Sequence, residues 1–250
     1  MPKALEVRGV GVRFGDFQAV ADVDLNVASG SIHSVIGPNG AGKTTLFNAL
    51  TGVRPPTTGQ ILFGDEDVAR RSSHYRVRCG MARSFQVTNI FQELTVAENL
   101  RLGVQALSPS GGGRVFWRSP ARDTDVIAGV EKLLVMLRLE ERAGTRAGDL
   151  SHGGQRALEI GMALASDPQI IFLDEPLAGM GIDDVYRTRD LIRNLAPART
   201  VMLVEHNMSV VLDISDRITV LAQGRKIAEG PPAEIRVDKA VRTAYLGGSA

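Results

Sequence analysis

The stretch Gly37-Pro38-Asn39-Gly40-Ala41-Gly42-Lys43-Thr44-Thr45 decides the fold. It has the pattern G-x-x-x-x-G-K-[ST], in which glycines let backbone N–H groups turn inward around phosphate oxygens. The flanking residues predict a strand at 31–36 and a helix at 44–50, so the loop ends at a helix N-terminus that favours an anion. We therefore expect a bound triphosphate, with Lys43 on its β- and γ-phosphates and the Thr44 hydroxyl on Mg²⁺.

A pair of carboxylates follows an apolar strand later in the chain. The run Ile170-Ile171-Phe172-Leu173 is typical of a buried parallel strand and is followed by Asp174 and Glu175. Such a strand brings Asp174 to the sheet edge beside the phosphate loop, where it is expected to hold Mg²⁺. Glu175 is predicted to orient and deprotonate the attacking water. The alternative, a solvated turn, fits poorly with Pro176 and the apolar run.

The presence of these motifs changes the interpretation of two further polar residues, Gln86 and His206. Gln86, in Arg83-Ser84-Phe85-Gln86, is predicted to contact Mg²⁺ or its water, although alone it would read as a surface residue at a strand end. His206 follows a strand predicted at 201–204, which should lie beside the Asp174 strand. We therefore expect His206 near the γ-phosphate, whereas an isolated histidine would more often be a core residue.

The segment Leu150-Ser151-His152-Gly153-Gly154-Gln155 precedes a helix expected at 157–165. Ser151 is a candidate N-cap. Ser-x-Gly-Gly at a helix start is also a second candidate anion site, but no motif of the same chain provides reactive groups to match it. We expect this site to close over a nucleotide bound to another subunit, completing the charge clamp only on assembly.

Composition sets limits on function. The chain has 250 residues, 44% of them hydrophobic, which suffices for one large domain or two small ones. A net charge of +1 gives no field that would attract nucleic acid. A single cysteine, Cys79, excludes an internal disulfide. No apolar run is long enough to predict a membrane span, and the first residues do not have the pattern of a signal peptide.

Taken together, these motifs resemble those of ABC-type ATPase domains over essentially the whole chain. Residues 37–45 are similar to Walker A, Gln86 to the Q-loop, 150–155 to the signature motif, 170–174 to Walker B and His206 to the switch histidine. The resemblance implies that Glu175, His206 and Lys43 are catalytic and that Thr44, Gln86 and Asp174 hold Mg²⁺. It implies ATP contacts from Phe14, Val20, Gly37, Pro38, Asn39, Gly40, Ala41, Gly42, Lys43, Thr44, Thr45, Ser151, Gly153, Gly154 and Gln155, with the Phe14 ring stacked on adenine.

The resemblance also implies a fold and partners. The expected fold is a single ABC ATPase domain over residues 1–250, with a RecA-like α/β P-loop core, an N-terminal antiparallel β subdomain and an inserted helical subdomain at about 88–150. Family members act as dimers that hold two ATP between Walker A of one subunit and the signature of the other. The implied partners are transmembrane permease subunits, a second ABC ATPase subunit of the same or another kind and, indirectly, a periplasmic or extracellular solute-binding protein. The implied location is the cytoplasmic face of a bacterial inner membrane.

Shorter runs are similar to the ATPases of branched-chain amino-acid importers. They are Asn89-Ile90-Phe91-Gln92-Glu93-Leu94-Thr95-Val96-Ala97-Glu98-Asn99-Leu100, Leu158-Glu159-Ile160-Gly161, Ala178-Gly179-Met180, Glu205-His206-Asn207-Met208, Ile214-Ser215-Asp216-Arg217 and Ala244-Tyr245-Leu246-Gly247. ATPases of urea or short-amide importers share some of these runs, and those of lipopolysaccharide export share the Tyr-Leu-Gly ending. Gly154 replaces the usual Gln of the signature and Gly181 a frequent Asp, both at the expected dimer interface.

Other classes of protein fit less well. A soluble ABC protein of DNA repair would need a long coiled coil between Gln86 and Ser151, one of translation would need two such domains, and a metabolic kinase would lack the signature helix. A transport role adds one expectation, namely that the apolar residues after Gln86 line a groove for a permease helix. Ordinary core packing is the alternative for these residues, which are Ile90, Phe91, Leu94 and Val96.

Overall fold

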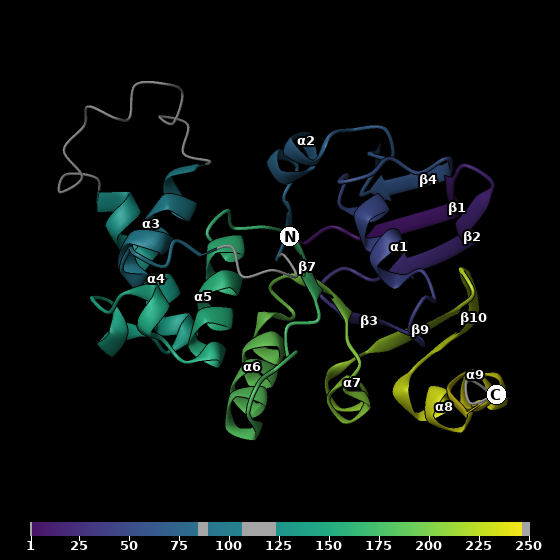
Figure 1. Cartoon of the computed structure of the whole chain (residues 1–250). Helices are drawn as coiled ribbons and strands as arrows, with labels where there is room; N and C mark the ends of the chain where they lie inside the picture. The colour runs from purple at the N-terminus through teal and green to yellow at the C-terminus, as the bar shows by residue number, and fades with distance from the viewer. Residues whose placement is uncertain (1, 85–89, 107–123, 247–250) are drawn as a thin grey trace.

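The structure, a computed structural model, describes residues 2–84, 90–106 and 124–246 and contains two sheets with helices around them (Figure 1). The first sheet is antiparallel, in the order β2-β1-β4-β5. Its strands are β1 (Leu5–Phe14), β2 (Phe17–Val27), β4 (Thr58–Phe63) and β5 (Glu66–Asp67). The second sheet has the order β10-β9-β3-β8-β7-β6. Its strands are β3 (Ile32–Ile36), β6 (Met81–Arg83), β7 (Ile170–Asp174), β8 (Thr200–Val204), β9 (Arg217–Ala222) and β10 (Arg225–Gly230).

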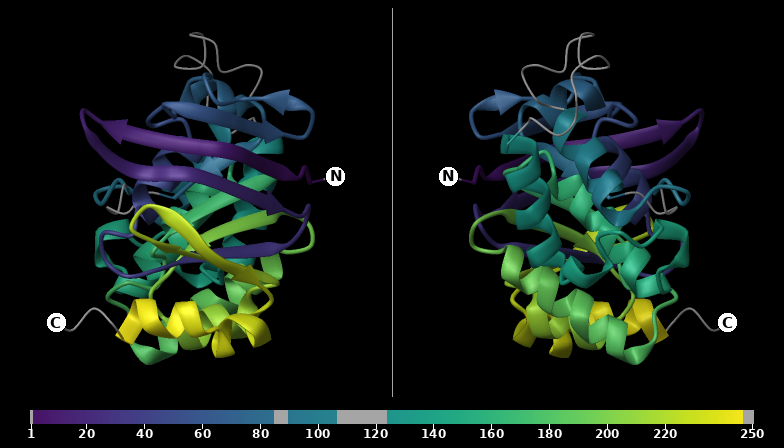
Figure 2. Two further views of the ribbon diagram at one scale, coloured as in Figure 1. Left: turned by 90° about the vertical axis from the view of Figure 1, so that its right-hand side faces the viewer. Right: turned by 90° about the vertical axis from the view of Figure 1, so that its left-hand side faces the viewer.

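The helices connect and cover these sheets. They are α1 (Lys43–Leu50), α2 (Ser73–Arg78), α3 (Val96–Ala106), α4 (Thr124–Leu137), α5 (His152–Leu164), α6 (Ile182–Leu195), α7 (Met208–Ile214), α8 (Pro232–Val237) and α9 (Lys239–Leu246), with short 3-10 turns η3 (Glu140–Arg142) and η4 (Ala147–Asp149). Figure 2 shows the antiparallel sheet on one side of the molecule and the C-terminal helices α8 and α9 below the second sheet. Among the described elements, none is a helix long and apolar enough to cross a membrane.

The second sheet brings the ends of three strands to one edge. Strand β3 is parallel to β8 and β9, and β7 is parallel to β8 and β6. Every residue of β3, β7 and β8 is buried, as the continuous apolar runs predict. Asp174 pairs with Val204, and Val35 pairs with the same residue from the other side. The phosphate loop after β3, the acidic pair after β7 and His206 after β8 therefore leave the sheet side by side.

Two large apolar clusters lie on opposite faces of this sheet. Ile170 and Phe172 belong to a cluster with α1 and the antiparallel sheet, whereas Ile171 and Leu173 belong to a cluster with α3 to α6. This division follows from the two-residue repeat of a strand. The ring of Phe172 meets that of Phe47 on α1 edge to face, with the centroids 5.7 Å apart. The phosphate-loop helix is thus packed directly on the strand that carries Asp174.

The sequence predictions for the strands at 31–36, 170–173 and 201–204 are confirmed to within one residue. The β9–β10 hairpin and α8 were not predicted. Gln86 lies outside the described residues.

Candidate nucleotide-binding and hydrolysis site

The phosphate loop is folded tightly around its own lysine. A Cβ atom on Gly37 (φ +152°) would lie 2.1 Å from the carbonyl oxygen of Leu221, and one on Gly42 (φ +96°) 2.6 Å from that of Ala19, so both positions require glycine. Lys43 is 6% exposed and its Nζ donates to the carbonyls of Gly37 (2.8 Å) and Pro38 (3.1 Å). Burial lowers the pKa of Lys43, while the nearby carboxylates oppose that shift. The ammonium thus lies across the loop, where phosphate oxygens could replace its carbonyl partners.

Phe14 and Val20, both expected to contact ATP, have different surroundings. The Phe14 ring is 45% exposed, with the guanidinium of Arg54 3.9 Å from its centroid. An exposed ring of this kind can stack on a base. Val20, by contrast, is fully buried, and its Cγ2 lies 3.4 Å from the place of a Cβ on Gly42. Val20 is therefore packed against the phosphate loop, and its contact with ATP stays a prediction.

Asp174 has one free carboxylate oxygen. It is fully buried; its Oδ2 accepts a 2.8 Å hydrogen bond from Arg83 Nη2, while its Oδ1 is buried without a partner among the described residues. Thr44, in the first turn of α1, is exposed. A free carboxylate oxygen and a hydroxyl beside a phosphate loop fit Mg²⁺, which keeps several waters and phosphate oxygens as ligands. Within the described ranges there is no cluster of three or more His, Cys, Asp or Glu residues suited to a metal.

The side chains of Glu175 and His206 meet at this edge of the sheet, with His206 Nε2 2.7 Å from Glu175 Oε1. Glu175 is 22% exposed and takes the unusual φ of +50°. Its N–H donates to the carbonyl of Val204 (2.9 Å), and its own carbonyl accepts from Arg156 Nη2 (3.2 Å). These bonds fix a strained backbone, a feature often found at catalytic groups. The carboxylate is accessible to water and can accept its proton.

Three charged residues, buried or nearly so, hold this arrangement together, and the sequence analysis did not single them out. Arg83 bonds Asp174, Arg156 bonds the carbonyl of Glu175, and the Glu205 carboxylate accepts N–H bonds from Leu177 (2.8 Å) and His206 (2.9 Å). Burial raises the pKa of Glu205, and these N–H groups oppose the rise. The available signal was a charged residue directly beside a motif in an otherwise apolar run.

The signature segment forms the start of α5. Ser151 is the N-cap, and its Oγ accepts from the N–H of Gly154 (3.2 Å), so the helix begins at His152, earlier than predicted. The Gln155 amide donates to the carbonyls of Gly148 (3.3 Å) and Leu150 (3.4 Å). A Cβ on Gly153 would lie 2.2 Å from Asp184 Cγ, so a side chain at this position requires the Asp184 side chain to move.

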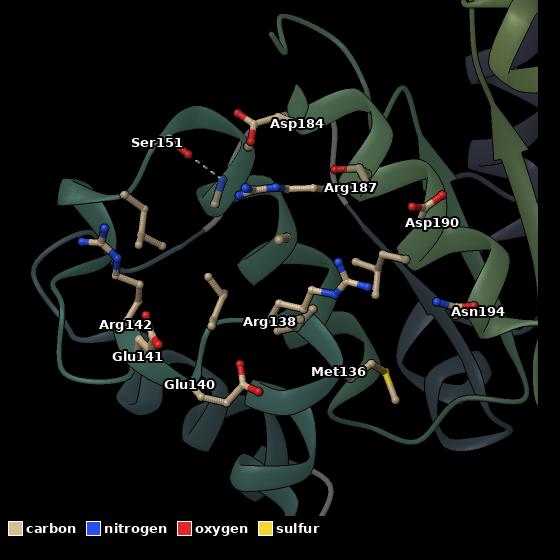
Figure 3. A pocket seen from close by; sticks show the side chains of 18 of the residues that line it. Met136, Arg138, Glu140, Glu141, Arg142, Ser151, Asp184, Arg187, Asp190 and Asn194 are labelled. Atoms are coloured by element: carbon tan, nitrogen blue, oxygen red, sulfur yellow. Dashed lines mark hydrogen bonds between the residues drawn. The ribbon is translucent and has the colours of Figure 1, made fainter. Parts of the chain in front are cut away.

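A cavity of about 710 Å³ opens beside this segment, between η3, the end of α4 and one side of α6 (Figure 3). Its walls include Ser151, Gly153 and side chains of both charges, namely the arginines Arg138, Arg142 and Arg187 and the acidic residues Glu140, Glu141, Asp149, Asp184 and Asp190. In the described part of the chain, none of these arginines has an ion-pair partner. The wall includes no residue of the phosphate loop and none of Asp174, Glu175 and His206. The predicted site residues therefore fall into two groups: the structure joins Lys43, Asp174, Glu175 and His206, and leaves Ser151 at a separate cavity.

Gly181 lies at the start of α6 in extended backbone (φ −68°), and a Cβ there would meet nothing within 4 Å. The replacement of a frequent Asp at this position is therefore not a steric requirement of the monomer.

The largely parallel second sheet, the phosphate loop and the acidic strand end define the chain as a P-loop nucleoside triphosphatase. A family model described as ABC transporter matches residues 20–178, and one described as branched-chain amino acid ATP-binding cassette transporter matches residues 225–250. The chain belongs to the ABC transporter family as an ATP-binding subunit.

Similar proteins agree with this assignment. The chain is 38% identical over 248 residues to the high-affinity branched-chain amino acid transport ATP-binding protein LivG of Escherichia coli (strain K12), with 97% of each chain covered. The corresponding protein BraF of Pseudomonas aeruginosa (strain PAO1) is also 38% identical over 248 residues, again with 97% of each chain covered. Among solved structures, a nucleotide-free ATP-binding cassette from an ABC transporter has a TM-score of 0.85 at 30% identity, over 97% of this chain and 98% of that one.

Proposed function

We propose that this chain hydrolyses ATP to energise the uptake of branched-chain or related amino acids through separate permease subunits, at the cytoplasmic face of a bacterial inner membrane. The observation that carries the proposal is the match of the C-terminal segment 225–250 to the family model of branched-chain amino acid cassettes, in addition to the ABC transporter match at 20–178. The likeness to LivG and BraF over 97% of the chain supports the same cargo class.

Each residue of the site has a proposed role in hydrolysis. Lys43 turns from the carbonyls of Gly37 and Pro38 to the β- and γ-phosphates. Thr44 and the free Oδ1 of Asp174 hold Mg²⁺, which when bound neutralises charge on the phosphates. Glu175 accepts a proton from the attacking water, and His206 orients its carboxylate through the 2.7 Å contact.

The signature segment is proposed to act on a second subunit's nucleotide. The N-terminus of α5 opens onto this cavity and offers backbone N–H groups to an anion, yet the wall contains none of the hydrolytic residues of the same chain. The side chains of the wall have mixed charge, three arginines and five carboxylates, so the helix N-terminus is the anion-binding feature. Such an anion site can contribute to hydrolysis when a second ATPase subunit brings the nucleotide held in its phosphate loop against it. This supports a dimer of ATPase subunits with ATP between them.

Docking on a permease is proposed to involve Phe91. Of the four apolar residues expected to line a groove, Ile90 and Val96 are buried in the core and Leu94 is partly buried, so ordinary packing explains them. Phe91 is 54% exposed. Phe91→Asp should abolish co-purification with permease subunits and retain ATPase activity, whereas Val237→Asp, at a site 69% exposed on α8, should change neither. Unaltered co-purification of the Phe91 variant would end this part of the proposal.

Uptake by intact cells tests the cargo. Deletion of the gene should abolish high-affinity uptake of labelled leucine and valine and leave uptake of an unrelated sugar unchanged. The wild-type gene should restore uptake, and Glu175→Gln should not. Loss of urea or short-amide uptake with normal leucine uptake would overturn the proposed cargo and favour the related importer class, and a defect confined to lipopolysaccharide export would do the same for that class.

A further inference from the structure

The side chain of Arg83 connects the phosphate-loop helix to the acidic strand. Its Nη2 donates to Asp174 Oδ2 (2.8 Å), and its Nη1 donates to Asn48 Oδ1 (2.6 Å) and to Thr51 Oγ1 (3.1 Å). The Arg83 side chain is 11% exposed and that of Asp174 is fully buried. One guanidinium thus bonds two secondary-structure elements in the interior of the molecule.

Strand register explains why Arg83 reaches Asp174. Arg83 on β6 pairs with Phe172 on β7, and Asp174 lies two residues further along β7 on the same face. That face packs on α1, as the contact of Phe172 with Phe47 demonstrates. A diagonal neighbour at this separation is within reach of a long side chain.

The α1 end of the connection leads back to the proposed metal site. Thr44 and Asn48 on α1 and Thr51, the C-cap of α1, are spaced four and three residues apart and therefore lie on one side of the helix. The Thr51 hydroxyl donates to the carbonyl of Phe47 (2.7 Å), so its oxygen is free to accept from Arg83. Arg83 is therefore held one helical turn below Thr44, and from there it bonds Asp174.

We propose that Arg83 is a positioning residue for Mg²⁺: by bonding Asp174 Oδ2 and α1 together, it keeps Asp174 Oδ1 directed at the metal that Thr44 and the phosphates share. The proposal deepens the proposed function and depends on the metal role of Asp174 given there. The forked guanidinium suits the task because it donates to several acceptors in fixed directions, which a lysine ammonium does not. Residues that orient a metal-binding carboxylate contribute to metal affinity without touching the metal.

The test separates metal binding from nucleotide binding. Mn²⁺ affinity is measured by electron paramagnetic resonance in the presence of a non-hydrolysable ATP analogue, and binding of a fluorescent ATP analogue is measured in EDTA. Arg83→Met should weaken Mn²⁺ binding about tenfold or more, and should leave metal-free nucleotide binding within about twofold of wild type. Arg83→Lys and Asn48→Ala should weaken Mn²⁺ binding less, in the same direction, and they remain decisive if Arg83→Met does not fold.

Two reference variants complete the design. Arg199→Met removes an arginine with the same 11% exposure, which pairs with Asp167 away from the site, and should leave Mn²⁺ binding unchanged. Asp174→Asn should abolish it. Unaltered Mn²⁺ affinity in folded Arg83→Met, with Asp174→Asn defective, would overturn the role of Arg83 alone, as would an equal loss of metal-free nucleotide binding. Unaltered affinity in Asp174→Asn would overturn the proposed metal site and the role of Arg83 with it.

Discussion

Nε2 of His206 lies 2.7 Å from Oε1 of Glu175, although the two residues belong to different strand ends and are separated by 31 positions in the chain. The contact arises because β7 and β8 are parallel neighbours in register, with Asp174 opposite Val204. The backbone reinforces it, since the N–H of Glu175 donates to the carbonyl of Val204 and the N–H of His206 donates to Glu205. The orientation of the Glu175 carboxylate thus depends on His206.

His206→Gln should lower the rate of ATP hydrolysis by roughly 10²-fold or more and leave ATP affinity nearly unchanged, because the imidazole orients the base and does not hold the nucleotide. Phosphate release and calorimetry measure the two quantities. His74→Gln, an exposed histidine on α2, serves as the control and should behave as wild type. Equal turnover in the two variants would remove His206 from the mechanism.

Arg76 should contribute strongly to stability. It is 1% exposed, and its guanidinium donates to four carbonyls, those of Ala49, Leu50, Ala69 and Arg71. Burial lowers its pKa to about 10, so it stays charged at neutral pH, next to the C-terminus of α1. Arg76→Met leaves buried carbonyls without donors and should cost about 3 kcal/mol of unfolding free energy.

Denaturant unfolding measures this loss. Arg78→Met, two residues further on and exposed, is the matched control and should change the unfolding free energy by less than about 0.5 kcal/mol. A similar small change in both variants would show that the Arg76 bonds add nothing net.

His33 should make the protein sensitive to acid. Its ring is fully buried in β3 with Nε2 2.8 Å from Thr219 Oγ1, and burial lowers its pKa from 6.5 to about 4, with Glu229 opposing the shift and Arg217 and Lys226 adding to it. Above pH 6.5 the ring is neutral in both folded and unfolded chains. Between pH 6.5 and about 4 only the unfolded chain takes up the proton, so stability falls as the pH falls.

The His33 contribution to this loss is about 1.4 kcal/mol per pH unit, or about 3 kcal/mol over the whole interval. Unfolding free energies measured from pH 4 to 7 should therefore fall less steeply in His33→Val than in wild type, whatever the absolute stability of the variant. His74→Gln should keep the wild-type slope. Identical slopes in wild type and His33→Val would contradict a buried neutral ring.

The motif residues could be placed from the sequence because parallel strands deliver their ends to a common edge. Asp174 and His206 each follow a continuous apolar run, and the order of such runs sufficed to predict that they lie together. The sequence pattern could not predict that Phe91 is exposed while Ile90 is buried, because both residues are apolar. Only the packing of Ile90 in the cluster with α3 and α5 distinguishes them.

The hydrogen bonds that support the site could not be predicted from the sequence, for a different reason. Arg83, Arg156 and Glu205 act through partners 19 to 91 positions away along the chain, and no periodicity marks such pairs. Val20, which the resemblance associates with ATP, is fully buried beside Gly42, and this burial could not be predicted from the sequence either. Whether a side chain points to the nucleotide site or into the core depends on strand register and twist, and the sequence pattern does not give these.

The central claim is that the Ser151 end of α5 completes hydrolysis at the phosphate loop of a second subunit. The most direct measurement is the ATPase rate per chain against protein concentration, with molecular mass determined in the same samples, for wild type and Ser151→Trp. We predict a wild-type rate that rises as dimers form, and a Ser151→Trp rate lower by about 10²-fold or more with ATP binding retained. A protein that remains monomeric throughout turnover and hydrolyses ATP at the full wild-type rate with Ser151→Trp would contradict the claim.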